Sequence, residues 1–181
     1  MYNPYIQWVG KYFPNAVPVV DSFHVIQWIT RAIDQYIRQL IKKFRQRDRE
    51  LEEQLSREHL KPVSLPLSDE LYLLQKYRWL ILSNQSNIRY HSDLRMDSHL
   101  RCLMNTYDYE YALFNVDPVL EEFRDMKELY VRFNSRNAGK PLEAATELDE
   151  LIERYIYCEH DIFQNFGDLL KRYRDPIINS F

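Results

Sequence analysis

The hydrophobic period of this chain changes at Asp21. Before it, Val17, Val19 and Val20 are apolar and β-branched, which is typical of a short strand covered on both faces. From Phe23 onward, apolar residues recur at steps of three and four, which is the period of a helix. The stretch 14–28 therefore predicts a turn, a buried strand and the beginning of a long helix, with Asp21 at the junction.

Asp21 has two interpretations at this junction. A carboxylate at the end of a buried strand is where metal-dependent phosphoryl-transfer folds place a catalytic acid. Asp and Ser are also good helix N-caps, so Asp21 or Ser22 could simply accept the free amides of the first turn. Caps are far commoner than catalytic acids, and the local pattern by itself favours the cap.

The rest of the sequence predicts a succession of helices. The whole chain has only three glycines in 181 residues, which also favours helices. The helix after Asp21 should run for some thirty residues and project from one subdomain into another, because ordinary globular helices are shorter. Residues 61–68, with two prolines, are the clearest linker, and residues 137–141 break the chain again. The further helices are expected at 4–13, 73–81, 100–114, 118–133 and 148–173, the last of them bent at Gly167 or split in two.

Composition excludes some classes of protein. Mean hydropathy is −0.53, and no apolar run approaches the length of a membrane span, so we expect no membrane partner. The first residues lack the basic start and apolar centre of a signal peptide, which favours a cytoplasmic protein. Among the two cysteines and five histidines, only His91 and His99 are candidates for a ligand pair on one helix, and their spacing of eight favours surface residues over a zinc site.

Charge is distributed unevenly along the sequence although the net charge is only −3. Basic residues cluster between residues 31 and 49, whereas acidic residues dominate between residues 107 and 153. Six of the basic residues are candidates for contacts to an anion: Arg38, Lys42, Lys43, Arg45, Arg47 and Arg49. The alternative is that these side chains merely solvate the outer face of a long helix.

One predicted strand followed by helices is not a complete α/β domain, because a strand without partners exposes its edges. Either the strand prediction is wrong or the chain is a piece of something larger.

The first forty residues, in the run PYIQWVGKYFPNAVPVVDSFHVIQWITRAIDQYIRQL, resemble the bacterial insertion-sequence transposases of the ISL-three type. The shared pattern is a Pro-Tyr pair, a helix, Phe-Pro-x-Ala, a short apolar strand, Asp-x-Phe-His and a long helix. It is matched here at residues 4–5, 13–16 and 21–24. The remainder, down to the closing residues 174–181, more loosely resembles the family's helical region between its second and third carboxylates.

This resemblance implies a fold that is mainly α. Residues 1–60 would form a partial ribonuclease H-like βα unit with its long helix, and residues 61–181 an all-helical insertion region. It implies DNA strand cleavage and transfer by a DDE carboxylate triad with Mg²⁺ as cofactor. Asp21 would be the second carboxylate of the triad, and therefore both a catalytic residue and a metal ligand.

The resemblance also identifies what is missing from the triad. The family's first Asp lies just before the Pro-Tyr pair, and its Glu lies in an Asn-Gly-x-x-Glu segment downstream of the part that ends at Phe181. One carboxylate of three would bind Mg²⁺ weakly and leave the second metal site unbuilt. We therefore expect the isolated chain to have no strand-transfer activity.

The resemblance gives the basic residues a partner, since phosphate contacts along transposon-end DNA would suit the cluster at residues 31–49. A role for His24 is not fixed by its place in the motif. The aromatic residues Tyr107, Tyr111, Phe123, Tyr130 and Phe133 could stack bases, but their helical spacing favours core packing.

The competing function is a non-enzymatic helical module that dimerises or binds a protein. Apolar surface left uncovered by missing strands would favour a homo-oligomer in either case. Salt-sensitive DNA binding separates the two functions, because only the transposase interpretation expects it.

Overall fold

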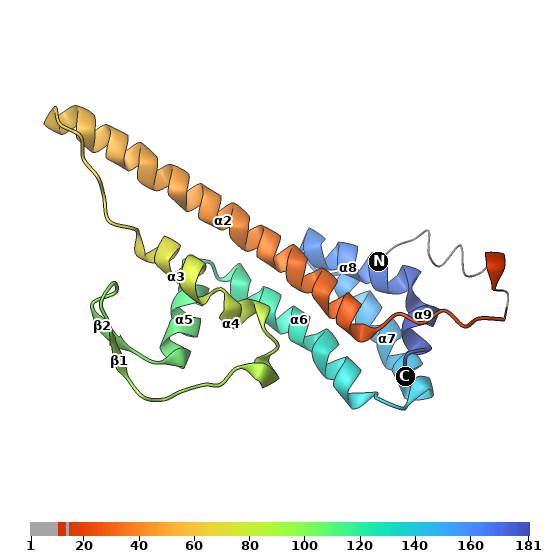
Figure 1. Ribbon diagram of the computed structural model, residues 1–181. Helices are drawn as coiled ribbons and strands as arrows, with labels where there is room; N and C mark the ends of the chain where they lie inside the picture. The colour runs from red at the N-terminus through yellow and green to blue at the C-terminus, as the bar shows by residue number, and fades with distance from the viewer. Residues whose placement is uncertain (1–10, 14) are drawn as a thin grey trace. The chain divides into compact units, whose positions relative to one another are not determined.

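The computed structural model of the chain describes residues 11–13 and 15–181, and the described part is mainly helical (Figure 1). The helix expected over residues 4–13 lies outside this part except for its end, where residues 11 and 12 are helical. By contacts the chain divides into two compact units, one made of residues 1–32 and 126–181 and the other of residues 33–125. The predicted boundary at residue 60 concerned family domains and stays a prediction.

The longest element is α2, Ser22–His59, a helix of 38 residues that continues from one unit into the other. Its buried side chains are Val25, Ile29, Ile33, Ile37, Leu40 and Ile41, all at most 9% exposed. They recur at three- and four-residue steps, so they form a single stripe on one side of the helix. Leu51, further along the same helix, is 46% exposed, so core packing supports α2 only as far as about its middle.

The unit of residues 1–32 and 126–181 is an all-helical cluster in the part that the structure describes. Besides the beginning of α2 it contains most of α6 (Val119–Arg136), α7 (Pro141–Ile156), α8 (Asp161–Arg172) and α9 (Arg174–Ile178). Its centre is aromatic: the ring of Phe166 contacts the rings of Trp28, Tyr130 and Tyr155 at centroid distances of 5.0–5.7 Å. Such buried aromatic contacts contribute beyond the apolar area that they remove from water.

The predicted strand over residues 17–20 is absent, and this prediction was wrong. These residues belong to no strand or helix, and Val17 and Val19 are 67% and 58% exposed. The backbone N–H of Val20 instead donates to the carbonyl of Pro176 at 2.8 Å. A single bond of this kind fixes the position of the segment without building a sheet, so the structure does not confirm a ribonuclease H-like βα unit.

The unit of residues 33–125 combines helices with a small hairpin. After α2 come α3 (Asp69–Tyr77), α4 (Trp79–Leu82), a 3₁₀ turn (Gln85–Asn87), β1 (Arg95–Asp97), β2 (Cys102–Met104), α5 (Thr106–Val116) and the beginning of α6. The strands pair antiparallel, with Met96 opposite Leu103. The region was predicted to be all helical, and the hairpin corrects that prediction.

The linker between α2 and α3 is confirmed, and side chains of α2 hold it. The N–H of Val63 donates to Ser56 Oγ at 2.9 Å, and the N–H of Leu65 donates to Glu52 Oε1 at 2.7 Å. These bonds satisfy backbone amides that an isolated linker would leave to water.

Candidate functional site

Asp21 is the N-cap of α2. Its Oδ1 accepts the backbone N–H of Phe23 at 2.8 Å, and its carbonyl oxygen accepts the N–H of His24 at 3.0 Å. This is the capping geometry that the local sequence favours. The side chain is nevertheless exposed, and within the described residues Oδ2 accepts no hydrogen bond. One oxygen of the carboxylate is therefore held and the other is open.

A pocket of about 470 Å³ opens beside Asp21. Its lining also includes Ser22, Asn134 of α6, Gly139 and residues 179–181. The amide of Asn179 donates to the carbonyl of Pro18 at 3.0 Å, which holds residues 179–181 next to the segment that leads into Asp21. Residues almost 160 positions apart therefore meet at this carboxylate.

Tyr130 of α6 is a buried residue whose pKa is influenced by the charge of Asp21. Burial, and then the negative charge of Asp21, raise the pKa of the Tyr130 hydroxyl well above its usual range. This hydroxyl has no hydrogen-bond partner among the residues that the structure describes. It is therefore a neutral donor in the surroundings of the carboxylate.

Metal ligands converge nowhere in the described part of the chain: residues 11–13 and 15–181 contain no group of three His, Cys, Asp or Glu placed to hold an ion. Asp21 is the one acidic side chain among the described residues that line its pocket. With a free Oδ2 it fits the role of one ligand in a set that needs others.

The six basic candidates on α2 fall into two kinds. Arg38 and Arg47 are engaged, because Arg38 Nε donates to Asp34 at 2.7 Å and Arg47 bridges two carboxylates. The remaining four make no ion pair in the described chain: Lys42, Lys43, Arg45 and Arg49.

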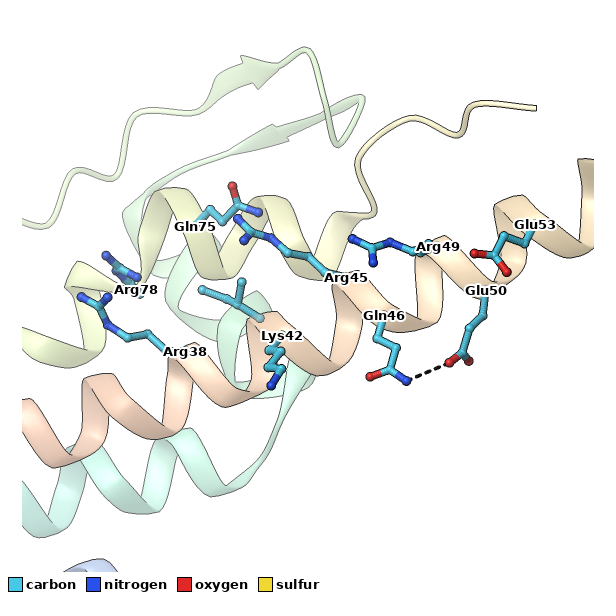
Figure 2. A pocket seen from close by; sticks show the side chains of 10 residues that line it. Arg38, Lys42, Arg45, Gln46, Arg49, Glu50, Glu53, Gln75 and Arg78 are labelled. Carbon is cyan, nitrogen blue, oxygen red and sulfur yellow. Dashed lines mark hydrogen bonds between the residues drawn. The ribbon is translucent and has the colours of Figure 1, made fainter. Parts of the chain in front are cut away.

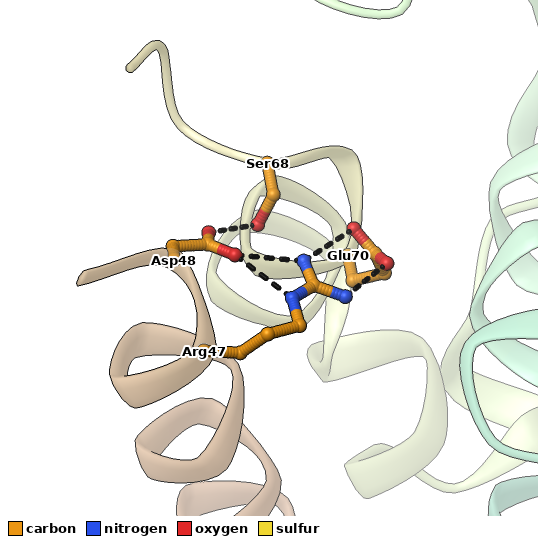
Figure 3. A network of polar contacts seen from close by, with 4 residues as sticks. All are labelled: Arg47, Asp48, Ser68 and Glu70. Carbon is orange, nitrogen blue, oxygen red and sulfur yellow. Dashed lines mark hydrogen bonds and ion pairs between the residues drawn. The ribbon is translucent and has the colours of Figure 1, made fainter. Parts of the chain in front are cut away.

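Arg47 belongs to a polar network that fastens α3 to α2 (Figure 3). Its guanidinium donates to Glu70 Oε1 and to Asp48 Oδ1, each at 2.8 Å. The hydroxyl of Ser68 donates to the other oxygen of Asp48 at 2.5 Å. The guanidinium of Arg47 is thus committed within the protein.

Four of the candidates line a groove of about 880 Å³: Arg38, Lys42, Arg45 and Arg49. The other side of this groove is formed by Gln75 of α3 and by Arg78, which links α3 to α4 (Figure 2). Sequence reasoning missed Arg78, because no local pattern connects it with residues 29 to 40 positions earlier.

The five aromatic residues considered for base stacking fall into a buried group and an exposed group. Phe123, Tyr130 and Phe133 are at most 2% exposed, so core packing is confirmed for them. Tyr107 and Tyr111 are 55% and 69% exposed and do not belong to the core.

Comparison with protein-family models decides the family. The model described as Transposase, of the ISL3-type DDE class, matches residues 1–181. The chain belongs to this transposase family. Comparisons with curated proteins and with solved structures gave no match.

Membership of the ISL3-type family accounts for the motif around Asp21 and for the extent of the resemblance, which covers the whole sequence given. The transposase chain has no helix, in the part described, that is both long and apolar enough to cross a membrane.

Proposed function

We propose that this chain is the central part of a DDE transposase that cuts and joins DNA at the ends of an insertion sequence, with Asp21 as its second catalytic carboxylate. The observation that carries the proposal is the place of Asp21 within the family match: an exposed carboxylate, in the Asp-x-Phe-His motif, on the rim of a pocket. Transposon-end DNA is the expected partner.

The N-cap hydrogen bond suits this role because it orients the carboxylate and engages only one of its two oxygens. The N–H of Phe23 holds Oδ1, and Oδ2 stays open. A carboxylate that is held through one oxygen loses little freedom when its other oxygen binds a cation. Asp21 is therefore suited to hold a Mg²⁺ ion through Oδ2.

Residues 179–181 support the same assignment. The family resemblance expects the third carboxylate downstream of Phe181, and these residues line the pocket beside Asp21.

Mg²⁺, when bound, would polarise the scissile phosphate and stabilise the leaving oxygen. A single carboxylate does not position this ion, because Mg²⁺ keeps several waters and needs ligands from more than one element. We therefore expect residues 1–181, expressed alone, to leave terminal-repeat DNA uncut. Metal-dependent cleavage by this chain that Asp21→Asn removes would contradict this expectation.

The test of the function begins with the DNA that flanks the gene. An Asp codon shortly before Met1 and an Asn-Gly-x-x-Glu segment after Phe181, in any frame, would supply the other two carboxylates. The polypeptide with both flanks restored should then cleave element ends with Mg²⁺, and Asp21→Asn should abolish cleavage. Asp168→Asn, at an exposed position of α8, is the matched control. An active Asp21→Asn enzyme would overturn the assignment.

A helical self-association module is the second candidate, and the hairpin favours it. Met96 and Leu103 face one another across the strands and are 69% and 56% exposed. Contiguous exposed apolar surface often marks a contact surface. Sedimentation of the chain and of Met96→Lys tests this function, because a dimer that the substitution splits would support it.

A further inference from the structure

The groove between α2 and the α3–α4 junction combines cations from two separate parts of the sequence (Figure 2). Arg38, Lys42, Arg45 and Arg49 stand at intervals of four, three and four residues, so they lie along one side of α2. Arg78 contributes a further guanidinium from the opposite side. The surface is therefore a positively charged channel and not simply the solvated side of one helix.

Most of this charge forms no ion pair among the residues that the structure describes. Lys42, Arg45 and Arg49 make no ion pair in the described chain, and Arg38 and Arg78 share the single carboxylate of Asp34, at 2.7 and 3.7 Å. Cations gathered in this way repel one another, and a bound polyanion relieves the repulsion.

Two carboxylates mark the end of the channel. Glu50 and Glu53 line it beyond Arg49, where Glu50 accepts the side-chain amide of Gln46 at 2.9 Å and Glu53 pairs with Arg57. The positive surface is thus limited to the stretch between Arg38 and Arg49.

The length of that stretch suits a nucleic-acid strand. Arg38 and Arg49 are eleven positions apart, which corresponds to roughly 16 Å along a helix. One strand of duplex DNA presents a phosphate about every 3.4 Å along the helix axis, so the row faces about five phosphates. Guanidinium groups match phosphate oxygens in a planar, two-pronged geometry, and arginine supplies most of the cations here.

We propose that this channel binds the sugar-phosphate backbone of duplex DNA and that Arg78 is one of its contacts. The inference rests on the proposed function for its ligand, because a transposase must hold DNA. It also removes Arg47 from the DNA-binding set, since that guanidinium is committed to Glu70 and Asp48.

The experiment measures how the affinity of residues 1–181 for a labelled duplex of about 30 base pairs, of arbitrary sequence, changes with KCl concentration. Each lost phosphate contact should reduce the slope of log K against log salt by about 0.9. Arg45→Gln and Arg78→Gln should each produce this reduction. Arg78→Lys, which keeps the charge, should restore most of the slope.

Arg47→Gln is the matched control from the same part of α2, and it should leave the slope unchanged. Equal slopes for wild type and Arg78→Gln would overturn the proposal, as would an Arg47→Gln slope reduced as much as that of Arg45→Gln. Thermal melts identify any variant that fails to fold. If Arg78→Gln is one of them, Arg78→Met, which also removes the charge, takes its place.

Two further outcomes bear on the ligand. The proposal would be overturned if the wild-type protein did not bind the duplex. It would also be overturned if polyglutamate, at the same concentration of negative charge, displaced the DNA. Catalysis is not needed for binding, so an active Asp21→Asn enzyme would refute the proposed function and leave this measurement standing.

Discussion

The hydroxyl of Tyr72 on α3 donates to Oδ2 of Asp97, at the end of β1, at 2.5 Å. Tyr109 of α5 donates to the same oxygen at 2.7 Å. The other oxygen accepts the N–H groups of His99 and Leu100 at 2.9 and 3.0 Å. Asp97 is only 4% exposed, so one nearly buried carboxylate joins two helices to the hairpin.

Replacement of Asp97 by Asn should lower the free energy of unfolding by about 1–3 kcal/mol. The amide keeps one acceptor oxygen but turns a donor toward groups that also donate. Urea denaturation at pH 7 measures the change. Asp93→Asn, at an exposed loop position, is the control and should unfold at the wild-type midpoint. An unchanged midpoint for Asp97→Asn would show that the carboxylate does not support the fold.

The same carboxylate predicts a pH dependence. Burial acts to raise the pKa of Asp97, but the hydrogen bonds from Tyr72, Leu100 and Tyr109 outweigh it and hold that pKa well below its usual range. A lowered folded-state pKa means that the stabilisation is fully present above the unfolded value of about 4 and is lost as pH falls further. The stability difference between wild type and Asp97→Asn should stay constant from about pH 7 to 5 and shrink below about pH 4. A difference that shrinks already between pH 7 and 5 would contradict this assignment.

The hairpin that contains Asp97 shows why sequence periodicity predicted this region only in part. Leu100, Leu103 and Tyr107 fall at helical spacing, which favoured a helix from residue 100. The structure starts α5 at Thr106, because Asn105 and Asp108 form a reciprocal capping box. Local hydrogen bonding decided the boundary, and hydrophobic spacing does not report it.

The candidate site was predictable to the extent that it is local. The junction at Asp21, the long helix and the basic cluster all follow from residues close together in the sequence. The partners of those residues do not: Arg78 enters the groove from another helix, and Glu70 removes Arg47 from it. Tertiary packing alone brings them together, so spacing along α2 could not separate free cations from engaged ones.

Gly167 of α8 is a position where the helix tolerates no side chain. A Cβ there would lie 2.8 Å from Cγ1 of Ile156 and 3.0 Å from its backbone nitrogen. Gly167→Ala should therefore destabilise the protein, because a steric cost of about 1–3 kcal/mol exceeds the helix preference of Ala, about 1 kcal/mol. Asn165→Ala, at an exposed position of α8, gains the preference without the clash and should not destabilise. Chemical denaturation of both variants compares them, and a stabilised Gly167→Ala protein would refute the close approach.

The Arg47–Glu70 pair should contribute a small, salt-sensitive coupling. The hydrogen bond from Arg47 holds the pKa of Glu70 below its usual range, and Arg47 is 48% exposed. Exposed ion pairs are typically worth about 0.2–1 kcal/mol. A double-mutant cycle with Arg47→Gln and Glu70→Gln should give a coupling in that range that falls at high salt. The pair Arg49→Gln and Glu70→Gln should show none.

The two roles of Asp21 can be separated with two substitutions. Asp21→Asn keeps an oxygen that can accept the N–H of Phe23, and Asn is as good an N-cap as Asp, so the unfolding free energy should be close to that of wild type. Asp21→Ala removes the cap and should cost about 1 kcal/mol. The flank-restored enzyme should lose DNA cleavage with either substitution, because neither side chain offers a charged oxygen to Mg²⁺. Denaturation and cleavage assays on the same preparations therefore distinguish a cap from a catalytic acid.

A loss of stability in Asp21→Asn as large as in Asp21→Ala would show that the hydrogen bond to Phe23 does not set the start of α2. Retained cleavage with Asn would leave Asp21 as a cap alone.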